Sequence, residues 1–203
     1  MRLSSTIHQF FNKYLPHIKA LSPHTVKSYR DTFKLFLPYA ANYHGIKISS
    51  LQIAHLSVEV ILDFLDNLEK QRQNSAKTRN SRLAALKSLA KMIRFMHPEQ
   101  RQLADKICSI PQKRCQRQLI GFLYPHEIDL ILQAVDLKNA LGLRDYCLLQ
   151  LLYDSGARAT EIATLNIDYF DAHNQTLVIL GKGNRFRQIE LWPKTCELIS
   201  LYL

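Results

Sequence analysis

Apolar residues recur every three or four positions along much of the first half of the chain, which is the spacing of one face of a helix. The first clear helix start is Ser22-Pro23, where the serine can cap the helix and the proline suits its first turn. Pro38 should kink this helix or end it near Leu37, because proline lacks an N–H group and crowds the preceding turn.

Two more apolar stripes follow in the first half. Ser57 caps the first stripe, which runs through residues 58–68, and the second covers 83–93 before a His-Pro pair ends it. Counting a further helix before Ser22, the pattern predicts a small bundle of about four helices within residues 1–104.

The second half of the chain combines helices with one hairpin. Helices are predicted near 125–135 and over 143–153, and the latter is apolar almost all round and therefore expected to be buried. Gly156 suits a left-handed cap, and Thr160 is expected to cap a short helix after it. Two β-type runs then flank the turn 181–184, Gly-Lys-Gly-Asn, which predicts a β-hairpin. The predicted fold class is therefore mainly α with a small β-hairpin or sheet.

Charge also divides the chain. Residues 1–118 carry 20 basic and 7 acidic side chains, a net of +13, whereas residues 119–203 carry 7 and 10, a net of −3; the two sum to the chain's +10. The basic, aperiodic stretch 105–120 is either an extended linker or the end of the last helix. We therefore predict a helical domain over 1–104, a linker over 105–120, and a second domain over 121–203. A basic half beside a near-neutral one favours a polyanionic partner, with general solubility as the alternative.

Two local signals in the second domain can carry chemistry. Arg158 follows the helix-capping Gly156, and Glu161 can pair with it; a guanidinium held in this way can offer a fork to a phosphate, although the pair can also be purely structural. Lys182 lies between two glycines at the hairpin tip, where it can reach a phosphate or protonate a departing oxygen, unless it is an ordinary turn lysine.

The four cysteines include no Cys-x-x-Cys pair, so no metal and no disulfide are expected, and Cys147 is assigned to the core.

Read together, these segments resemble the tyrosine recombinase family, also called phage integrases. The family's first catalytic box, Gly-Leu-Arg-x-x-Glu-Leu, stands at residues 156–162 as Gly-Ala-Arg-Ala-Thr-Glu-Ile. Its hairpin, Gly-Lys-Gly-x-Lys-x-Arg-x-Val-Pro-Leu, stands at 181–191 as Gly-Lys-Gly-Asn-Arg-Phe-Arg-Gln-Ile-Glu-Leu. The segment from Ser22 to Tyr29 and the basic stretch 75–89 are similar to two helices of the family's core-binding domain.

The resemblance implies a four-helix core-binding bundle followed by the first part of a mixed α/β catalytic domain. It implies DNA cleavage and rejoining through a 3′-phosphotyrosine, without a metal or other cofactor. Arg158 would clamp the phosphate, Glu161 would orient it, and Lys182 would protonate the leaving 5′ oxygen. Duplex DNA is the expected partner, and the family assembles on it as a tetramer. The DNA contacts that we expect are Lys27, Arg30, Thr78, Arg79, Arg82, Lys87 and Lys91.

The family's later motifs, a His-x-x-Arg pair and the tyrosine nucleophile, do not occur after the hairpin in this sequence. Tyr153 and Tyr202 stand in other contexts and are expected to be structural. We therefore expect a chain truncated within the catalytic domain, which binds DNA but does not cleave it alone and which exposes apolar surface around 143–153. A DNA-binding regulator and an accessory protein that inhibits recombination are the alternatives. With no signal peptide and no membrane span in the sequence, a cytoplasmic location is expected.

Overall fold

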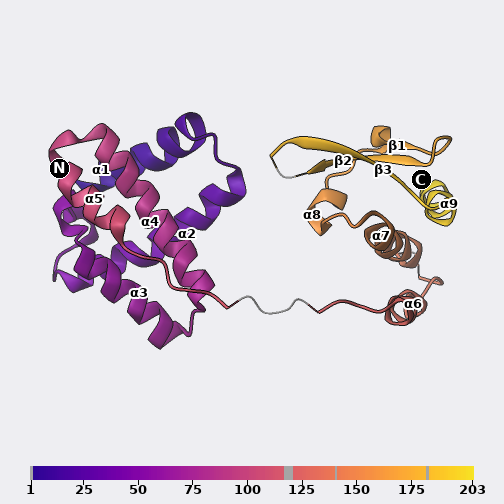
Figure 1. Ribbon diagram of the computed structural model, residues 1–203, viewed down its shortest axis with the longest axis horizontal. Helices are drawn as coiled ribbons and strands as arrows, with labels where there is room; N and C mark the ends of the chain where they lie inside the picture. Colours follow the sequence, from indigo (N-terminus) through magenta and orange to yellow (C-terminus); the bar gives the residue numbers. More distant parts are fainter. Residues whose placement is uncertain (1, 117–120, 140, 182) are drawn as a thin grey trace. The chain divides into compact units, whose positions relative to one another are not determined.

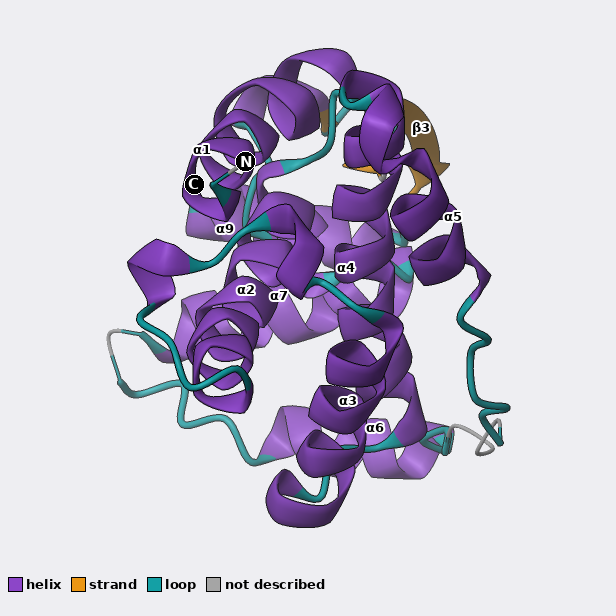
Figure 2. Ribbon diagram, turned by 90° about the vertical axis from the view of Figure 1, so that its left-hand side faces the viewer, coloured by secondary structure: helices purple, strands orange, loops and turns teal. Residues whose placement is uncertain are grey.

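The computed structural model describes residues 2–116, 121–139, 141–181 and 183–203 (Figure 1). The chain forms two compact units, Met1–Gln118 and Leu119–Leu203, which we call unit 1 and unit 2. Helices predominate in the described chain (Figure 2), as the pattern predicted. None of the helices within these ranges combines the length and the apolar character that a membrane crossing requires.

Unit 1 is a helical bundle. Its elements are α1 (Leu3–Gln9), the π-helix η1 (Phe10–Ile18), α2 (Pro23–Tyr43), the 3-10 turns η2 (Ile48–Ser50) and η3 (Ile53–His55), α3 (Val58–Arg72), α4 (Ala76–Met96), the 3-10 turn η4 (Pro98–Gln100) and α5 (Arg101–Ser109). The predicted caps are present, since Ser22 accepts a hydrogen bond from the Thr25 N–H at 3.4 Å and Ser57 accepts one from the Val60 N–H at 3.4 Å.

Helix α2 continues through Pro38 to Tyr43, so of the two predicted effects of this proline, a kink or an end near Leu37, the end does not occur. A proline inside a helix costs roughly 3 kcal/mol. Phe36 and Ala40, on either side of this proline, are both completely buried. We attribute the continuation of α2 to this packing, because each buried side chain contributes an apolar transfer term that offsets the cost.

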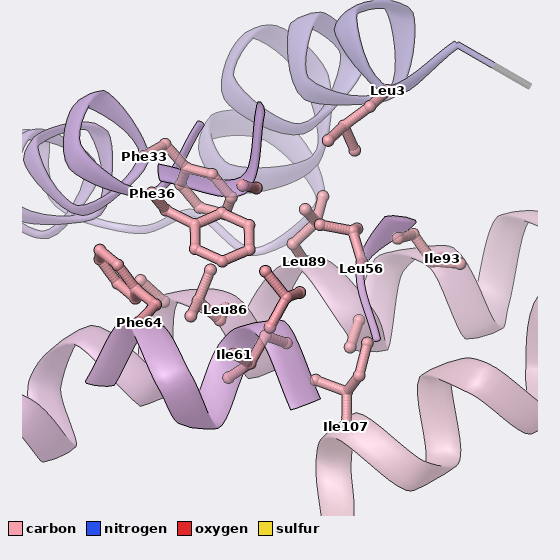
Figure 3. Close-up of a cluster of buried hydrophobic side chains, with 14 of the residues drawn as sticks. Leu3, Phe33, Phe36, Leu56, Ile61, Phe64, Leu86, Leu89, Ile93 and Ile107 are labelled. Atoms are coloured by element: carbon pink, nitrogen blue, oxygen red, sulfur yellow. The ribbon is translucent and has the colours of Figure 1, made fainter. Parts of the chain in front are cut away.

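Fourteen side chains of the unit 1 core are drawn in Figure 3, where Phe36 of α2 lies near Phe64 of α3. Their rings meet edge to face with centroids 5.1 Å apart. Leu86 and Leu89 of α4 are buried in the same cluster, as their helical spacing predicted. The core therefore joins α2, α3 and α4 and fixes how their polar faces are arranged.

Helix α5 ends at Ser109 and so covers the first part of the stretch 105–120, which was predicted to be either an extended linker or the end of the last helix. Its Ile107 is buried in the core of unit 1, as is Ile110 just after it, which explains why this stretch is part of the bundle. The chain then runs back past α4. The Asn80 side chain donates to the carbonyl of Lys113 at 2.7 Å and accepts from its N–H at 3.0 Å, while Lys113 Nζ lies 2.6 Å from Glu69 Oε2. We call this arrangement the Asn80 clamp.

Unit 2 contains a small antiparallel sheet and four helices among its described residues. Its elements are α6 (Pro125–Gln133), α7 (Gly142–Ser155), α8 (Ala159–Ile162), the 3-10 turn η5 (Ile167–Tyr169), β1 (Phe170–Asp171), β2 (Thr176–Gly181), β3 (Arg185–Glu190) and α9 (Pro193–Tyr202). The strand order is β1-β2-β3, and the predicted hairpin is β2–β3. Strand β1 is only two residues long, too short to leave an alternating pattern in the sequence.

The core of unit 2 lies between the hairpin and the helices. Leu177 and Ile179 of β2 pack in one cluster with Cys147 and Leu151 of α7. Helix α8 lies against the hairpin and the end of α7 (Figure 1). Helix α7 is not buried all round, because Leu148 is 39% exposed. The small core thus holds α8, the hairpin and α7 together, and these are the elements that carry the candidate chemistry.

Candidate functional site

Arg158 and Glu161 meet where α7 ends and α8 begins. Gly156 ends α7 with the predicted left-handed backbone, φ 58°. Arg158 is the residue that directly precedes α8, so the prediction that Thr160 caps this helix is wrong. Glu161 supplies the cap instead, because its Oε2 accepts a hydrogen bond from the backbone N–H of Arg158 at 2.9 Å. Local helix capping therefore brings the carboxylate to the arginine.

The Glu161 carboxylate also binds two guanidinium groups. Its Oε1 accepts from Arg158 Nη1 at 2.8 Å, and its Oε2 accepts from Arg187 Nη2 at 2.8 Å. The hydrogen bond from Arg187 and then those from Arg158 lower the pKa of Glu161 from its ordinary value of 4.5 to about 2. The Glu161 side chain is 6% exposed, whereas that of Arg158 is 68% exposed. One edge of the Arg158 guanidinium is thus held while the rest faces solvent.

Arg187 is a site residue that sequence reasoning did not assign. It pairs in register with Ile179 of β2 and therefore lies on the face of the hairpin that carries this fully buried side chain. Ile189 and Leu191 follow it at the same alternation. A cation at a core-facing position of a strand requires an acidic partner. The alternation of Arg187 with Ile189 and Leu191 could therefore have identified Arg187 from the sequence.

The predicted site lysine, Lys182, lies outside the described residues. Gly181, directly before it, is described and adjoins the carboxylate. A Cβ atom at Gly181 would lie 3.1 Å from Arg187 Nη1 and 3.5 Å from Glu161 Oε1. The backbone that leads to Lys182 therefore touches the cluster formed by Arg158, Glu161 and Arg187, which we call the Glu161 cluster.

Unit 1 carries a groove between the first turns of α2 and α4, with a volume of about 310 Å³. The residues that line this α2–α4 groove are His24, Lys27, Ser28, Asp31, Thr32, Thr78 and Arg82. Three of the predicted DNA contacts, Lys27, Thr78 and Arg82, therefore lie together. Both helices start with a Ser-x-x-Thr cap and present their N-terminal ends near the groove. The partial positive charge of two helix N-termini adds to that of the side chains.

Arg82 is the half-buried cation of the α2–α4 groove. Burial lowers the pKa of Arg82, and the charge of Arg72 lowers it further. Its Nε is inaccessible to solvent and has no hydrogen-bond partner among the described residues. A buried N–H without an acceptor is costly, but an anion in the groove cannot reach an atom that is inaccessible to solvent, so only the accessible part of the Arg82 guanidinium can contact a ligand there. The lining includes one carboxylate, that of the exposed Asp31, which lies 3.7 Å from Lys34 Nζ.

Arg79 is buried, which contradicts its predicted role as a DNA contact. Its side chain is 7% exposed, and its Nε lies 3.4 Å from Glu69 Oε2 of α3. Arg79 is four residues before Leu83 and seven before Leu86, so it continues the apolar stripe of α4 toward the core. It ties α4 to α3 and is not available to a ligand.

Lys87 and Lys91 lie on a different face of α4 from the groove. At 3.6 residues per turn they point roughly 180° away from Thr78 and Arg82. Lys91 lines a second groove, together with Arg94. The predicted contacts on α4 therefore belong to two separate surfaces.

Arg30 is the remaining predicted contact. It is exposed on α2, three residues after Lys27 and hence on the same side of that helix. Its guanidinium carbon lies 5.6 Å from the ring centroid of Phe11, a cation–π arrangement that holds the side chain over η1. Arg30 thus extends the charged surface that begins at the α2–α4 groove.

Metal-ligating and thiol side chains form no second centre in the described ranges, where no three His, Cys, Asp or Glu residues gather as a metal ion would need. Cys147 is buried, as predicted, and so is Cys196. Burial raises the pKa of both thiols, which disfavours the reactive thiolate. Among the described residues, the Glu161 cluster and the α2–α4 groove are the places that bring predicted site residues together.

Comparison with known families gives two matches. Residues 7–94 match the family described as "Phage integrase, N-terminal SAM-like domain", and residues 121–203 match "Phage integrase family". The chain is 34% identical over 202 residues to the Sinorhizobium fredii protein y4rC, which is named as an integrase/recombinase, covering 99% of this chain and 61% of that protein. A tyrosine recombinase XerC of Chlamydia muridarum is 31% identical over 207 residues, covering 95% of this chain and 64% of the relative. The chain thus spans less than two thirds of the length of either protein.

Solved structures show the same fold. The Tn1549 transposon integrase in complex with a circular intermediate DNA matches with a TM-score of 0.65 at 12% identity, covering 95% of this chain and 63% of the integrase. The XerH site-specific recombinase bound to its palindromic difH substrate matches with a TM-score of 0.64 at 19% identity, covering 87% of this chain and 51% of XerH.

Proposed function

Because the chain belongs to the phage integrase family of tyrosine recombinases, we propose that it is the DNA-gripping part and a portion of the catalytic domain of a site-specific recombinase. Unit 1 binds duplex DNA, and unit 2 brings Arg158, Glu161 and Lys182 to the phosphodiester. The proposal depends mainly on one observation, which is that Arg158 is both held by Glu161 and accessible to a ligand. Glu161 fixes one edge of its guanidinium, and the side chain remains 68% exposed to a ligand.

The α2–α4 groove supports DNA binding by unit 1. Lys27 and Arg82 supply positive charge there, and two helix N-termini add their partial charge. These are the features with which proteins bind backbone phosphates. Lys87 and Lys91, on the other face of α4, contribute to the positive field that attracts the duplex.

The Glu161 cluster supports a role in phosphodiester chemistry. In the proposed reaction a tyrosine oxygen bonds to phosphorus, and the bond from phosphorus to the 5′ oxygen breaks. Negative charge builds on the non-bridging oxygens, and a guanidinium held in advance, as Arg158 is, stabilises it. Lys182 gives a proton to the departing oxygen, which leaves as a hydroxyl. We assign no tyrosine of this sequence as the nucleophile.

We also propose that copies of the chain assemble on DNA. Unit 2 has an apolar pocket of about 200 Å³, whose rim includes Leu148, Ile167 and Tyr202, and all three side chains are exposed. Exposed apolar patches of this kind mark interaction surfaces. Sedimentation of the complex with DNA that carries two binding sites measures the number of copies bound.

The binding proposal is tested by fluorescence anisotropy of a labelled duplex over a range of salt concentrations. We expect the affinity to fall with a log–log slope of about −0.9 for each phosphate neutralised. Lys27→Ala and Arg82→Ala should each make the slope shallower by about 1. Lys47→Ala is the matched control, because it removes an exposed lysine beyond the far end of α2. A salt-independent affinity, or equal losses in all three variants, would refute the groove assignment.

A nicked suicide duplex tests the assignment of the nucleophile. We expect no covalent protein–DNA adduct with the 203-residue chain. An adduct that Tyr153→Phe or Tyr202→Phe abolishes would show that one of these tyrosines attacks DNA, and the reading of both as structural would then be wrong.

A further inference from the structure

We propose that Arg187 is a positioning residue that, through Glu161, holds Arg158 in a fixed arrangement against the end of strand β2 at Gly181. The inference rests on the function proposed above, because it names a further residue of the same site. It adds a third member to the pair Arg158 and Glu161, because it makes Arg187 of strand β3 one of the groups that orient Arg158.

The hydrogen bonds of Glu161 divide between the two arginines. Arg158 Nη1 binds Oε1 at 2.8 Å, Arg187 Nη2 binds Oε2 at 2.8 Å, and the Arg158 backbone N–H shares Oε2 at 2.9 Å. Without Arg187 the carboxylate would depend on contacts to a single residue, three positions away on its own helical turn. The bond to Arg187 spans 26 residues and therefore fixes the rotation of the carboxylate against β3.

Gly181 shows that Arg187 also packs against the hairpin backbone. A Cβ atom there would lie 3.1 Å from Arg187 Nη1, a tighter approach than side chains normally make. Glycine at this position lets the guanidinium lie beside the backbone that leads directly to Lys182. Arg187 thus lies against two described parts of the proposed site, Glu161 on one side and the backbone at Gly181 on the other.

Exposure separates the roles of the two arginines. The Arg187 side chain is 38% exposed and lies on the core-facing side of β3, whereas Arg158 is 68% exposed. A guanidinium that is partly buried and bound by a carboxylate suits the fixing of its neighbours, and the more exposed one suits contact with a phosphate. We therefore assign Arg187 to position the site and Arg158 to touch the phosphate.

The test is NMR of arginine side chains in the full 203-residue chain. In the wild type we expect the Arg158 Nε–H order parameter to approach the value of about 0.85 that rigid backbone shows, and in Arg187→Ala to fall below about 0.6, the flexible range, with a shift of the Gly181 amide signal. Arg187→Lys, which keeps one donor and the charge, should restore much of the order. Arg185→Ala, which removes an exposed arginine of the same strand, should leave Arg158 ordered.

Two outcomes would overturn the inference: an Arg158 side chain as ordered in Arg187→Ala as in the wild type, or one that Arg187→Lys fails to restore. If Arg187→Ala does not fold, the pair Arg187→Lys and Arg187→Gln decides, because both keep most of the side-chain volume and only the lysine keeps the charge. Equal Arg158 order in these two variants would also overturn the inference.

Addition of duplex DNA separates this test from that of the proposed function. An Arg158 signal that DNA does not shift would count against the phosphate contact and not against the positioning role.

Discussion

In unit 1 most lysines and arginines lie on exposed helix faces, whereas in unit 2 two arginines share one buried carboxylate. The first arrangement spreads positive charge over several surfaces, as the α2–α4 groove and the opposite face of α4 show. The second directs hydrogen bonds to one point. A surface of the first kind attracts a long polyanion and tolerates the loss of any one charge, whereas a cluster of the second kind fixes one group and depends on every member.

The hydrophobic cores of the two units also differ, in size and in how far polar contacts supplement them. Unit 1 buries large aromatic and aliphatic side chains from each of its long helices, so its shape is strongly fixed without help from polar groups. Unit 2 has a small core between the hairpin and α7, and the Glu161 cluster joins α8 to β3 at the edge of it. Polar contacts therefore carry a larger share of the structure in unit 2.

The largest expected effect concerns the apolar core of unit 1. Phe36→Ala removes a completely buried ring and should lower the free energy of unfolding by about 3–5 kcal/mol. Phe95→Ala removes a ring that is 71% exposed and should change it by less than about 0.5 kcal/mol. Urea denaturation followed by circular dichroism measures both. Similar losses in the two variants would mean that packing does not dominate unit 1.

An intermediate effect is expected from pH in unit 2. The pKa of Glu161 is lowered from 4.5 to about 2 by its hydrogen bonds to Arg187 and Arg158. A lowered carboxyl pKa stabilises the folded state above the unfolded value, so this contribution is complete above pH 4.5 and is lost as the pH falls toward 2. Thermal unfolding of the wild type and of Glu161→Gln at a series of pH values from about 7 down to about 2 checks this prediction. The two proteins should differ most at neutral pH and converge in acid, and a constant difference would contradict the assignment.

The smallest expected effect concerns the Asn80 clamp. Asn80→Ala removes both hydrogen bonds to the Lys113 backbone and should cost about 1 kcal/mol. Cleavage by trypsin after Lys113 and Arg114 should become faster, because the released segment fits a protease more easily. Asn12→Ala, which changes an exposed asparagine of η1, is the matched control. Equal cleavage rates in the two variants would show that the clamp does not hold this segment.

The serine-capped starts of α2 and α3, the hairpin and the left-handed Gly156 were predictable, because each depends on residues close together in the sequence. The end of α2 was not, because the packing of Phe36 and Ala40 offsets the local preference of Pro38. The sequence did not decide whether residues 105–120 are a linker or the end of the last helix, because buried positions such as Ile107 lie there within a basic stretch without a clean period.

The two arginines that sequence reasoning misjudged have one property in common. Arg79 continues the apolar stripe of a helix, and Arg187 continues the apolar face of a strand. Each finds a glutamate from another element, Glu69 and Glu161 respectively. Composition and charge density treat every arginine alike, so only the position within the element's period shows which cations turn inward. Arg82 and Lys27, in contrast, were predicted as contacts and do line the groove.

The segment held by the Asn80 clamp includes Cys115, whose thiol can be labelled. Cys115 is exposed and lies 3.3 Å from Asn80 Nδ2, whereas Cys147 and Cys196 are buried and Cys108 is half-buried. A maleimide dye should therefore attach to Cys115 before it reaches the other thiols, because accessible thiols react first. A dye can therefore be placed at a single site, in the segment that leads out of unit 1, without changing the sequence. The rotational mobility of this dye would show whether the Asn80 clamp is formed or broken.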